Sequence, residues 1–291
     1  MLQKLVNALR LPFLIASFLP AAAAGALAVH DGNFSAWPFF VSAFAILCAH
    51  AGTNLANDYF DYKAGNYPKV KKGPTGGSFA IQNRDFAAGQ IYKMSIACFV
   101  LSLGLFAYLA TQSSPLILGL GIAGVAIGFF YTAPPVKLGY RLLGEMATFV
   151  GMGPLLFETV YFATTGTFST AGLLLSAFLG VLVLNILLAA QIPDIEVDQA
   201  SRKHTISAKL GPSALYNTFL LANIFGALAL VASVAWHGMP TEILVALVGS
   251  ALAFKAYSLL TQEKPLEALG YCLNALQIGG ILLILALILK I

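Results

Sequence analysis

Long apolar segments separated by short polar ones dominate the chain. Segments without any Asp, Glu, Lys or Arg cover residues 94–136, 159–193, 210–241 and 268–289. A helix that spans a bilayer needs about 20 mostly apolar residues, so each segment has room for one or two spans. The pattern therefore predicts a polytopic helical membrane protein. Membrane β-barrels show a different pattern, in which apolar and polar residues alternate within short segments.

Nine transmembrane helices fit this pattern. We predict them at about 11–30, 37–58, 91–111, 115–132, 142–164, 170–191, 213–236, 241–260 and 267–289. The segment 11–30 is too long for the apolar core of a cleavable signal and leads directly into further protein, so we interpret it as the first span. The predicted fold class is all-α, with residues 1–291 in a single transmembrane domain.

Basic residues follow the topology of the predicted spans. The connections 30–36, 111–114, 164–169 and 236–240 contain no Lys or Arg. Of the 16 basic residues, 15 lie on the other side, in the N-terminus, in the remaining connections or in the parts of the spans beside them. Lys290 is the exception. The positive-inside rule assigns the basic side to the cytoplasm. The N-terminus is therefore predicted in the cytoplasm and the C-terminus outside a plasma membrane.

Composition agrees with a protein surrounded by lipid. The chain is 59% hydrophobic and 10% charged, and its mean hydropathy is +0.83. A soluble domain has about 25% charged residues. The formal net charge of +4 reflects topology, and without an arginine-rich patch it does not indicate a nucleic-acid partner. Cys48, Cys98 and Cys272 lie in apolar segments without metal-binding spacing, so we expect small buried side chains.

A first acidic cluster lies where the second apolar segment ends. Asn54, Asp58 and Asp61 are spaced i, i+4 and i+7, so they are predicted to share one face of a helix. His50 extends this face one turn deeper into the membrane. Carboxylates are costly near a bilayer, and they usually mark an ion or substrate site.

A second acidic cluster, Asp194 and Asp198, follows the sixth predicted span, again with a spacing of four residues. Clustered oxygen ligands suit Mg²⁺, which is commonly shared with substrate phosphates. Clusters of thiols or imidazoles, which zinc or copper would favour, are absent from the sequence. A simpler alternative is that each acid is solvated or caps a helix, as Asp194 after Pro193 could do. Two clusters at one membrane face favour the metal site.

Basic residues and long connections accompany both clusters. The nearby basic residues are Lys71, Lys72, Arg84, Lys137, Arg141, Arg202 and Lys203. Most can be topology markers, but a subset facing a cavity would neutralise phosphate oxygens that Mg²⁺ leaves uncovered. The glycine-rich segment 71–77 adds backbone amides that could bind an anion, although it is not a Walker A sequence. The connections 58–90 and 193–212 are too long for simple turns, and we expect them to form a cap.

Three segments resemble the UbiA superfamily of intramembrane prenyltransferases. Segment 54–65 resembles its first aspartate motif, and segment 194–211 resembles its second. Segment 131–145 is similar to the connection between helices four and five in that family. The Asn-Asp-Tyr-Phe-Asp-Tyr string at 57–62 looks most like the branch that prenylates 1,4-dihydroxy-2-naphthoate, as do the Gly73-Pro74 loop and the Tyr-Arg-x-x-Gly-Glu ending at 140–145. Gly65 stands where the superfamily often has a third Asp.

The resemblance implies Mg²⁺-dependent transfer of a polyprenyl group from its diphosphate to a lipophilic acceptor, inside a helix-lined cavity that opens to the cytoplasm. It implies one Mg²⁺ on Asn54, Asp58 and Asp61 and a second on Asp194 and Asp198. The candidates for binding the diphosphate are Asn54, Lys71, Lys137, Arg141, Arg202 and Lys203. Tyr131 is the candidate for lining the reactive carbon.

Alternatives remain for the acceptor and for the class of protein. The resemblance favours 1,4-dihydroxy-2-naphthoate, while 4-hydroxybenzoate and geranylgeranylglyceryl phosphate stay open. An ion-coupled transporter would also place acids in the membrane, near the midplane. The two clusters lie at helix ends, which favours the enzyme. Glu158 and several amides do lie within spans, and we expect the amides to hydrogen-bond between helices: Asn185, Asn217, Asn223, Asn274 and Gln277.

Overall fold

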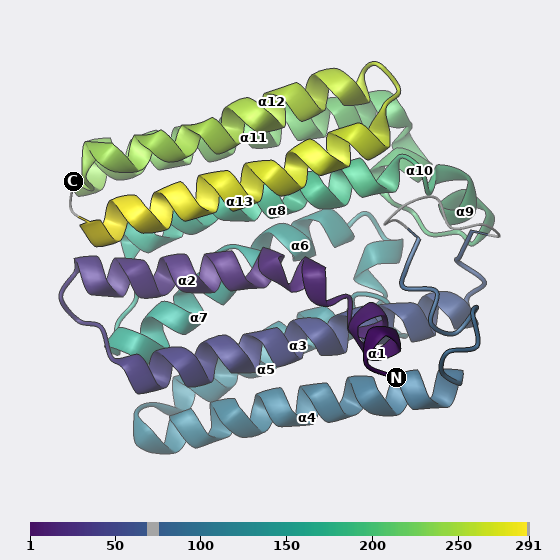
Figure 1. Cartoon of the computed structure of the whole chain (residues 1–291), viewed down its shortest axis with the longest axis horizontal. Helices are drawn as coiled ribbons and strands as arrows, with labels where there is room; N and C mark the ends of the chain where they lie inside the picture. The colour runs from purple at the N-terminus through teal and green to yellow at the C-terminus, as the bar shows by residue number, and fades with distance from the viewer. Residues whose placement is uncertain (69–75, 290–291) are drawn as a thin grey trace.

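The computed structural model describes residues 1–68 and 76–289, and these residues are helical with short connections and no β-sheet (Figure 1). The α-helices are α1 (Leu2–Leu9), α2 (Ile15–His30), α3 (Ala36–Lys63), α4 (Ala88–Gln112), α5 (Pro115–Phe130), α6 (Gly144–Met152), α7 (Pro154–Thr165), α8 (Thr170–Gln191), α9 (Ile195–Ala200), α10 (Ile206–Leu210), α11 (Pro212–His237), α12 (Leu247–Leu260) and α13 (Pro265–Leu289). Short 3₁₀ segments cover Leu11–Leu14, Leu138–Tyr140 and Thr241–Ala246.

Eight helical segments in the described part of the chain are long and apolar enough to cross a membrane, which confirms a polytopic helical membrane protein. The predicted span 115–132 is present as α5, which is apolar but has only 16 residues. Its length of about 24 Å is less than the thickness of about 30 Å that the hydrocarbon core of a bilayer has. Length therefore identifies eight candidate spans and leaves α5 as a shorter apolar helix.

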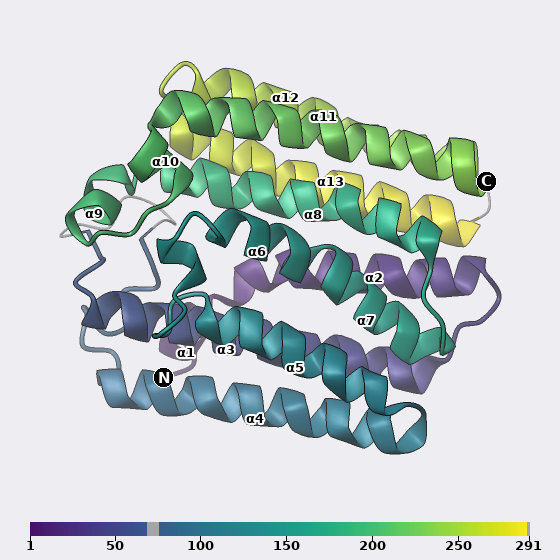
Figure 2. The same ribbon diagram turned by 180° about the vertical axis from the view of Figure 1, so that it is seen from behind.

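The long helices run side by side and form a layered bundle (Figures 1 and 2). In both views α8, α11, α12 and α13 lie on one side of the bundle, and α3, α4 and α5 lie on the other. α2, α6 and α7 lie between these two groups. The middle layer contacts both sides, because α2 packs against α13 and α7, and α7 packs against α3 and α8.

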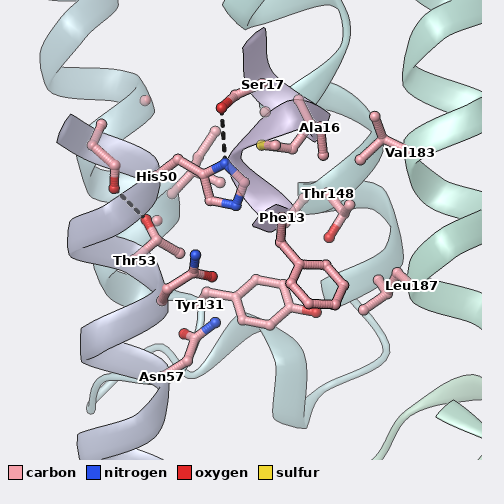
Figure 3. A pocket seen from close by; sticks show the side chains of 18 of the residues that line it. Phe13, Ala16, Ser17, His50, Thr53, Asn57, Tyr131, Thr148, Val183 and Leu187 are labelled. Carbon is pink, nitrogen blue, oxygen red and sulfur yellow. Dashed lines mark hydrogen bonds between the residues drawn. The ribbon is translucent and has the colours of Figure 1, made fainter. Parts of the chain in front are cut away.

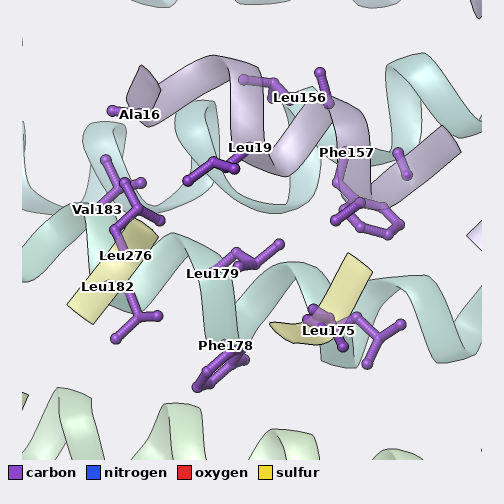
Figure 4. Packing of buried hydrophobic residues seen from close by; sticks show 14 of the residues in the cluster. Ala16, Leu19, Leu156, Phe157, Leu175, Phe178, Leu179, Leu182, Val183 and Leu276 are labelled. Carbon is purple, nitrogen blue, oxygen red and sulfur yellow. The ribbon is translucent and has the colours of Figure 1, made fainter. Parts of the chain in front are cut away.

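Burial separates central helices from peripheral ones. In the most apolar stretch of α8, 72% of the residues are buried inside the protein, compared with 28% in α4. Leu179 of α8 packs among Leu19 of α2, Phe157 of α7 and Leu276 of α13 (Figure 4). α4 leaves side chains such as Val100 exposed, which suits contact with lipid.

The middle layer breaks at Gly153 and Pro154. The predicted span 142–164 is two helices, because α6 ends before Gly153 and Pro154 starts α7. Proline fits the first turn of a helix, where its missing N–H needs no partner. A Cβ atom at Gly153 would lie 2.8 Å from the Cα atom of Gly180, so the break brings this backbone directly against α8.

One end of the bundle collects the acidic residues. α3 continues five residues beyond its predicted end at residue 58, as far as Lys63, and so keeps Asp61 on a helix. The connection after α3 and the segment with α9 and α10 lie together at this end, whereas α13 finishes at the opposite end (Figure 1). We call it the carboxylate end, defined by Asp61, Asp194 and Asp198.

We expect Gly249→Ala to destabilise the contact between α12 and α13. The added Cβ would lie 2.8 Å from the Ala275 carbonyl oxygen and 3.0 Å from the Gly279 Cα atom. Neither atom can move without the backbone, so the free energy of unfolding should fall by about 1–3 kcal/mol. Thermal denaturation of the detergent-purified protein would measure the change. Gly270→Ala is the matched control, because nothing lies within 4 Å of its added Cβ. An equal effect of both substitutions would contradict this packing.

Candidate active site

A cavity of about 360 Å³ lies inside the bundle and reaches the carboxylate end. Its lining there is polar and comprises Asp61, Asn66, Gly76, Gly77, Asp194, Asp198, Lys203 and Thr205. Deeper in the bundle the lining becomes apolar and includes Phe13, Ala16, Ile46, Phe106, Val125, Leu156, Val183 and Leu187 (Figure 3). A molecule with an anionic head and an apolar tail would match both parts of this cavity.

The pocket face of α3 differs by one residue from the predicted stripe. Asn54, Asp61 and His50, which belong to the predicted stripe, line the cavity, and so does Asn57, which does not belong to it. Asp58 is not part of the lining. Asn54 donates a hydrogen bond from Nδ2 to the Leu9 carbonyl oxygen at 3.3 Å, which leaves its Oδ1 atom available to a ligand. The face that points into the cavity is therefore centred on Asn57 and Asp61.

Asp58 is bound by the N-terminal segment. Arg10, between α1 and the 3₁₀ turn at Leu11–Leu14, donates from Nη2 to the Asp58 carboxylate, whose side chain is 7% exposed. The backbone N–H of Ser78 also donates to Asp58, at 3.3 Å. Arg10 and Gly77 line the cavity themselves, so Asp58 lies directly behind its wall and holds both in place.

The second acidic cluster lines the cavity from the opposite side. Asp194 accepts a hydrogen bond from the backbone N–H of Gly76 at 3.1 Å. Asp198 is 3% exposed and accepts from Asn66 Nδ2 at 3.1 Å and from Thr205 Oγ1 at 3.2 Å. Burial and the neighbouring Asp198 carboxylate raise the pKa of Asp194 to about 6. Burial also raises the pKa of Asp198, against the opposing effect of the Lys203 charge. The pair therefore carries more negative charge than its protein neighbours compensate.

Lys203 connects the two clusters. Its Nζ atom lies 3.1 Å from Asp61 Oδ2, while Tyr140 donates its hydroxyl to Asp61 Oδ1 at 2.7 Å. Burial opposes the charge on Lys203, but the carboxylates of Asp61 and Asp198 outweigh it and raise the pKa of Lys203. The ammonium group also lies 5.4 Å from the centre of the Tyr140 ring, a cation–π contact.

Hydrogen bonds fix the segment that carries Lys203. The backbone N–H of Lys203 donates to the Asp198 carbonyl oxygen at 2.8 Å. The buried carboxylate of Glu145, at the start of α6, accepts from Gln191 Nε2 at 2.9 Å and from the Ile206 N–H at 3.0 Å. One carboxylate thus joins the end of α8 to the start of α10, and both acids of the second cluster lie between these two points.

Tyr131, the candidate for lining the reactive carbon, lines the cavity just beyond the end of α5. Its ring packs against Gly139 and Gly144, where an added Cβ would lie 2.9 Å and 3.0 Å from Tyr131 atoms. Burial raises the pKa of Tyr131 to about 12, so the hydroxyl group stays protonated at neutral pH. The residue offers a neutral aromatic face and a hydroxyl group to whatever occupies the cavity.

The structure separates Lys203 from the other predicted basic residues. Lys137 lies over the Tyr140 ring at 5.0 Å, and exposed Arg141 donates to the Pro135 carbonyl oxygen at 2.9 Å. Arg202 is exposed. None of these three lines the cavity formed by the described residues. Lys71 lies outside the described residues.

The oxygen atoms that the protein provides at the carboxylate end could hold Mg²⁺ only together with oxygen atoms from a bound molecule. Within residues 1–68 and 76–289, no three His, Cys, Asp or Glu side chains come together as a self-sufficient metal site. The available hard donors are the Asn54 amide oxygen and the carboxylates of Asp61, Asp194 and Asp198. Mg²⁺ commonly takes one or two carboxylates and completes its shell with water and phosphate oxygens. The uncompensated charge on Asp194 and Asp198 also favours a cation.

Sequence reasoning missed several contributors to this site. Arg10 looked like a topology marker, because its partner Asp58 is 48 positions away in the chain. Asn57 could have been found, since a stripe through His50, Asn54, Asn57 and Asp61 also follows helical spacing. Sequence reasoning also missed Asn66, Tyr140 and Thr205, which hydrogen-bond directly to the acids, and Glu145, which holds the segments beside them. No local pattern in the sequence marks the partners of these residues.

Comparison with known proteins finds a matching family and several relatives of this chain. The model of the UbiA prenyltransferase family matches residues 17–287. The 1,4-dihydroxy-2-naphthoate octaprenyltransferase of Bacillus subtilis is 28% identical over 198 residues, which cover 68% of this chain and 63% of that protein. The chain thus spans slightly less than two thirds of this relative's length.

Two solved structures show a similar fold. The apo structure of a UbiA homolog from Aeropyrum pernix K1 has a TM-score of 0.70 and 18% identity, and the match covers 94% of this chain and 98% of that one. A UbiA homolog from Archaeoglobus fulgidus, bound to DMAPP and Mg²⁺, has a TM-score of 0.64 and 14% identity, with coverage of 94% and 99%.

We expect Arg10→Gln to destabilise the carboxylate end far more than Lys4→Gln. Arg10 compensates the buried Asp58 carboxylate, and removing one partner of a buried ion pair costs about 3–5 kcal/mol. Lys4 pairs with Asp85 at 2.8 Å, but its side chain is 52% exposed, so its loss should cost under about 1 kcal/mol. Thermal denaturation of the purified variants would compare them. The double variant Arg10→Gln/Asp58→Asn should regain stability, since an amide needs no counter-charge. Equal melting temperatures for the two single variants would contradict this interpretation.

Proposed function

Because the chain belongs to the UbiA prenyltransferase family, we propose that it transfers a prenyl group from a prenyl diphosphate to a lipophilic acceptor. One observation carries the proposal. Carboxylates from two distant parts of the chain, Asp61 and the pair Asp194 and Asp198, converge with Lys203 on the polar end of a cavity that is otherwise apolar. A diphosphate head and an isoprenoid tail need this combination of surroundings.

The polar end would stabilise the leaving group. In the reaction, the bond between the prenyl C1 carbon and the diphosphate breaks, and its electron pair leaves with the diphosphate. The Lys203 ammonium group, which lines the polar end of the cavity, would bind the developing negative charge. Two Mg²⁺ ions, which we place at Asn54 with Asp61 and at Asp194 with Asp198, would supply Lewis-acid stabilisation of the same charge. Asp58 would act indirectly, by holding Arg10 and Gly77 in the cavity wall.

The apolar part would protect the allylic cation until the acceptor reacts with it. Side chains such as Phe13 and Leu187 line this part and would exclude water, which would otherwise capture the cation. The Tyr131 ring lies between the polar and apolar linings and could stabilise positive charge on the prenyl group through its π face (Figure 3). An acceptor carbon then forms a bond to C1 with an electron pair of its ring. The same carbon loses the substituent that it carried, either a proton or a carboxylate group as CO₂, and the electron pair of the broken bond returns to the ring.

We extend the proposal to the arrangement in the membrane. α5 would act as a ninth, short span, and residues 1–291 would form one domain. The connections 58–90 and 193–212 would cap the carboxylate end, and this end would face the cytoplasm, as the positive-inside rule predicts for the side with the basic residues. Two solved relatives share the fold, and one of them is described with DMAPP and Mg²⁺, which supports a prenyl diphosphate and magnesium as ligands here.

For the acceptor we propose 1,4-dihydroxy-2-naphthoate, which is the substrate named for the Bacillus subtilis relative. 4-Hydroxybenzoate and geranylgeranylglyceryl phosphate are the other candidates from the sequence. Family membership and the position of the acids at one end of the bundle favour prenyl transfer over the ion-coupled transporter.

We expect Asp194→Asn to reduce prenyl transfer about 100-fold or more, since it removes a carboxylate that would hold the cation at the leaving group. Purified protein in detergent, with farnesyl diphosphate, 1,4-dihydroxy-2-naphthoate and MgCl₂, provides the assay, and product is separated by chromatography. Excess chelator should abolish turnover, and added MgCl₂ should restore it. Asp85→Asn is the matched control, because Asp85 pairs with Lys4 outside the cavity. Undiminished turnover in Asp194→Asn or in excess chelator would reject the metal-assisted scheme.

We expect 1,4-dihydroxy-2-naphthoate to be prenylated with a kcat/KM at least about tenfold above that of 4-hydroxybenzoate. The deeper lining of the cavity is apolar, and the second ring of the naphthoate would add apolar area that can be buried against it, which should strengthen binding. A competition assay that offers both acceptors with one labelled prenyl diphosphate measures the ratio directly. A preference for 4-hydroxybenzoate or for a glyceryl phosphate acceptor would reject the naphthoate and leave prenyl transfer intact.

A further inference from the structure

His50 is a polar side chain in the deeper part of the cavity. It lies on the pocket face of α3, one turn and about 6 Å along the helix axis before Asn54 (Figure 3). The lining in this part combines apolar side chains such as Phe13 and Ala16 with the polar side chains of Ser17 and Thr53 (Figure 3). The proposed transfer of the prenyl group has so far given His50 no role.

Ser17 determines which nitrogen of the His50 ring carries a proton. The Ser17 hydroxyl donates to the Leu14 carbonyl oxygen at 3.0 Å, and a hydroxyl group has only one proton to donate. The contact of 2.8 Å between Ser17 Oγ and His50 Nδ1 must therefore use a proton on Nδ1. In the neutral ring, Nε2 is then left with a lone pair and no proton.

The Nε2 lone pair faces the cavity. Figure 3 shows the nitrogen turned away from Ser17, toward the space bounded by Phe13, Tyr131 and Thr148. Within the described part of the chain, Nε2 has no hydrogen-bond partner. A polar atom that is buried inside the protein is costly unless a hydrogen-bond partner satisfies it, and here the partner can only be a water molecule or a ligand in the cavity. The position therefore requires a hydrogen-bond donor from whatever occupies the cavity.

The chemistry of the proposed substrates indicates which of them donates a hydrogen bond to His50 Nε2. The isoprenoid tail has no polar hydrogen, and a metal-bound diphosphate presents only acceptor oxygens. An acceptor with a hydroxyl group on an aromatic ring has the donor that Nε2 lacks. On the basis of the proposed function, we infer that His50 is the residue that binds the acceptor, through a hydrogen bond from an acceptor hydroxyl group to Nε2. A ring held there lies one helical turn from Asn54, beside the place proposed for the diphosphate.

A matched pair of probes tests this hydrogen bond without requiring turnover. 1-Naphthol has the hydroxyl donor, and 1-methoxynaphthalene has a similar ring without it. We expect the purified protein to bind 1-naphthol more tightly, and His50→Asn to weaken 1-naphthol binding about tenfold while leaving 1-methoxynaphthalene binding unchanged. Quenching of intrinsic fluorescence measures both affinities, and the ratio of wild type to variant cancels partition of the probes into detergent.

Three further variants identify the atom responsible. His50→Gln can place an acceptor oxygen near the position of Nε2, so it should keep most of the preference for 1-naphthol. Ser17→Ala leaves the His50 ring in place but no longer fixes its proton on Nδ1, so a partial loss is expected even if His50→Asn fails to fold. His237→Asn is the control, because His237 is exposed at the end of α11 and contacts Thr170. It should bind both probes as the wild type does.

The outcomes separate this inference from the proposed function. The hydrogen bond is rejected if His50→Asn weakens the binding of both probes equally or of neither probe. It is also rejected if Ser17→Ala binds 1-naphthol as tightly as the wild type does. If the wild type transfers no prenyl group to any acceptor, the proposed function is rejected, and the naphthol preference still decides the role of His50. In active protein, the KM for 1,4-dihydroxy-2-naphthoate should rise about tenfold in His50→Asn while the KM for farnesyl diphosphate stays unchanged.

Discussion

Buried carboxylates at the edge of an apolar bundle impose the strongest constraint on this structure, because an uncompensated charge there costs several kcal/mol. Asp58, Asp61 and Asp198 each receive a donor from an element distant in sequence: Arg10, Lys203 and Asn66 respectively. Each acid therefore fixes a remote segment against the end of α3 or α9. The groups that would bind a diphosphate are the same groups that hold the carboxylate end together.

The protein compensates the negative charge of the second acidic cluster less than that of the first. Asp58 and Asp61 have Arg10 and Lys203 as cationic partners, whereas Asp194 has one backbone N–H and lies beside another carboxylate. A site in which every acid were neutralised by the protein would have little affinity for a further cation. The remaining negative charge at α9 is what makes a magnesium diphosphate a fitting ligand in the proposed function.

The spans could be predicted from the sequence because lipid requires about 20 apolar residues in each, and the eight long segments follow that rule. The break at Gly153 and Pro154 could not be placed, because it depends on the close approach to Gly180. For the site, helical spacing brought Asp61 to the cavity but also suggested Asp58. The partner of Asp58 is 48 positions away, and no periodicity records such a pairing.

The cavity face of α3 shows how one helix could order a whole reaction. From its C-terminal end inward it presents Asp61, Asn57, Asn54, His50 and Ile46, a gradual change from charge through amide and imidazole to hydrocarbon. The rise of about 1.5 Å per residue spreads these groups over about 22 Å. Along that length, the proposed diphosphate, the reacting carbon with the acceptor, and the prenyl tail would each meet the polarity that suits it. Register along a rigid helix, set by sequence spacing alone, would then align the two substrates.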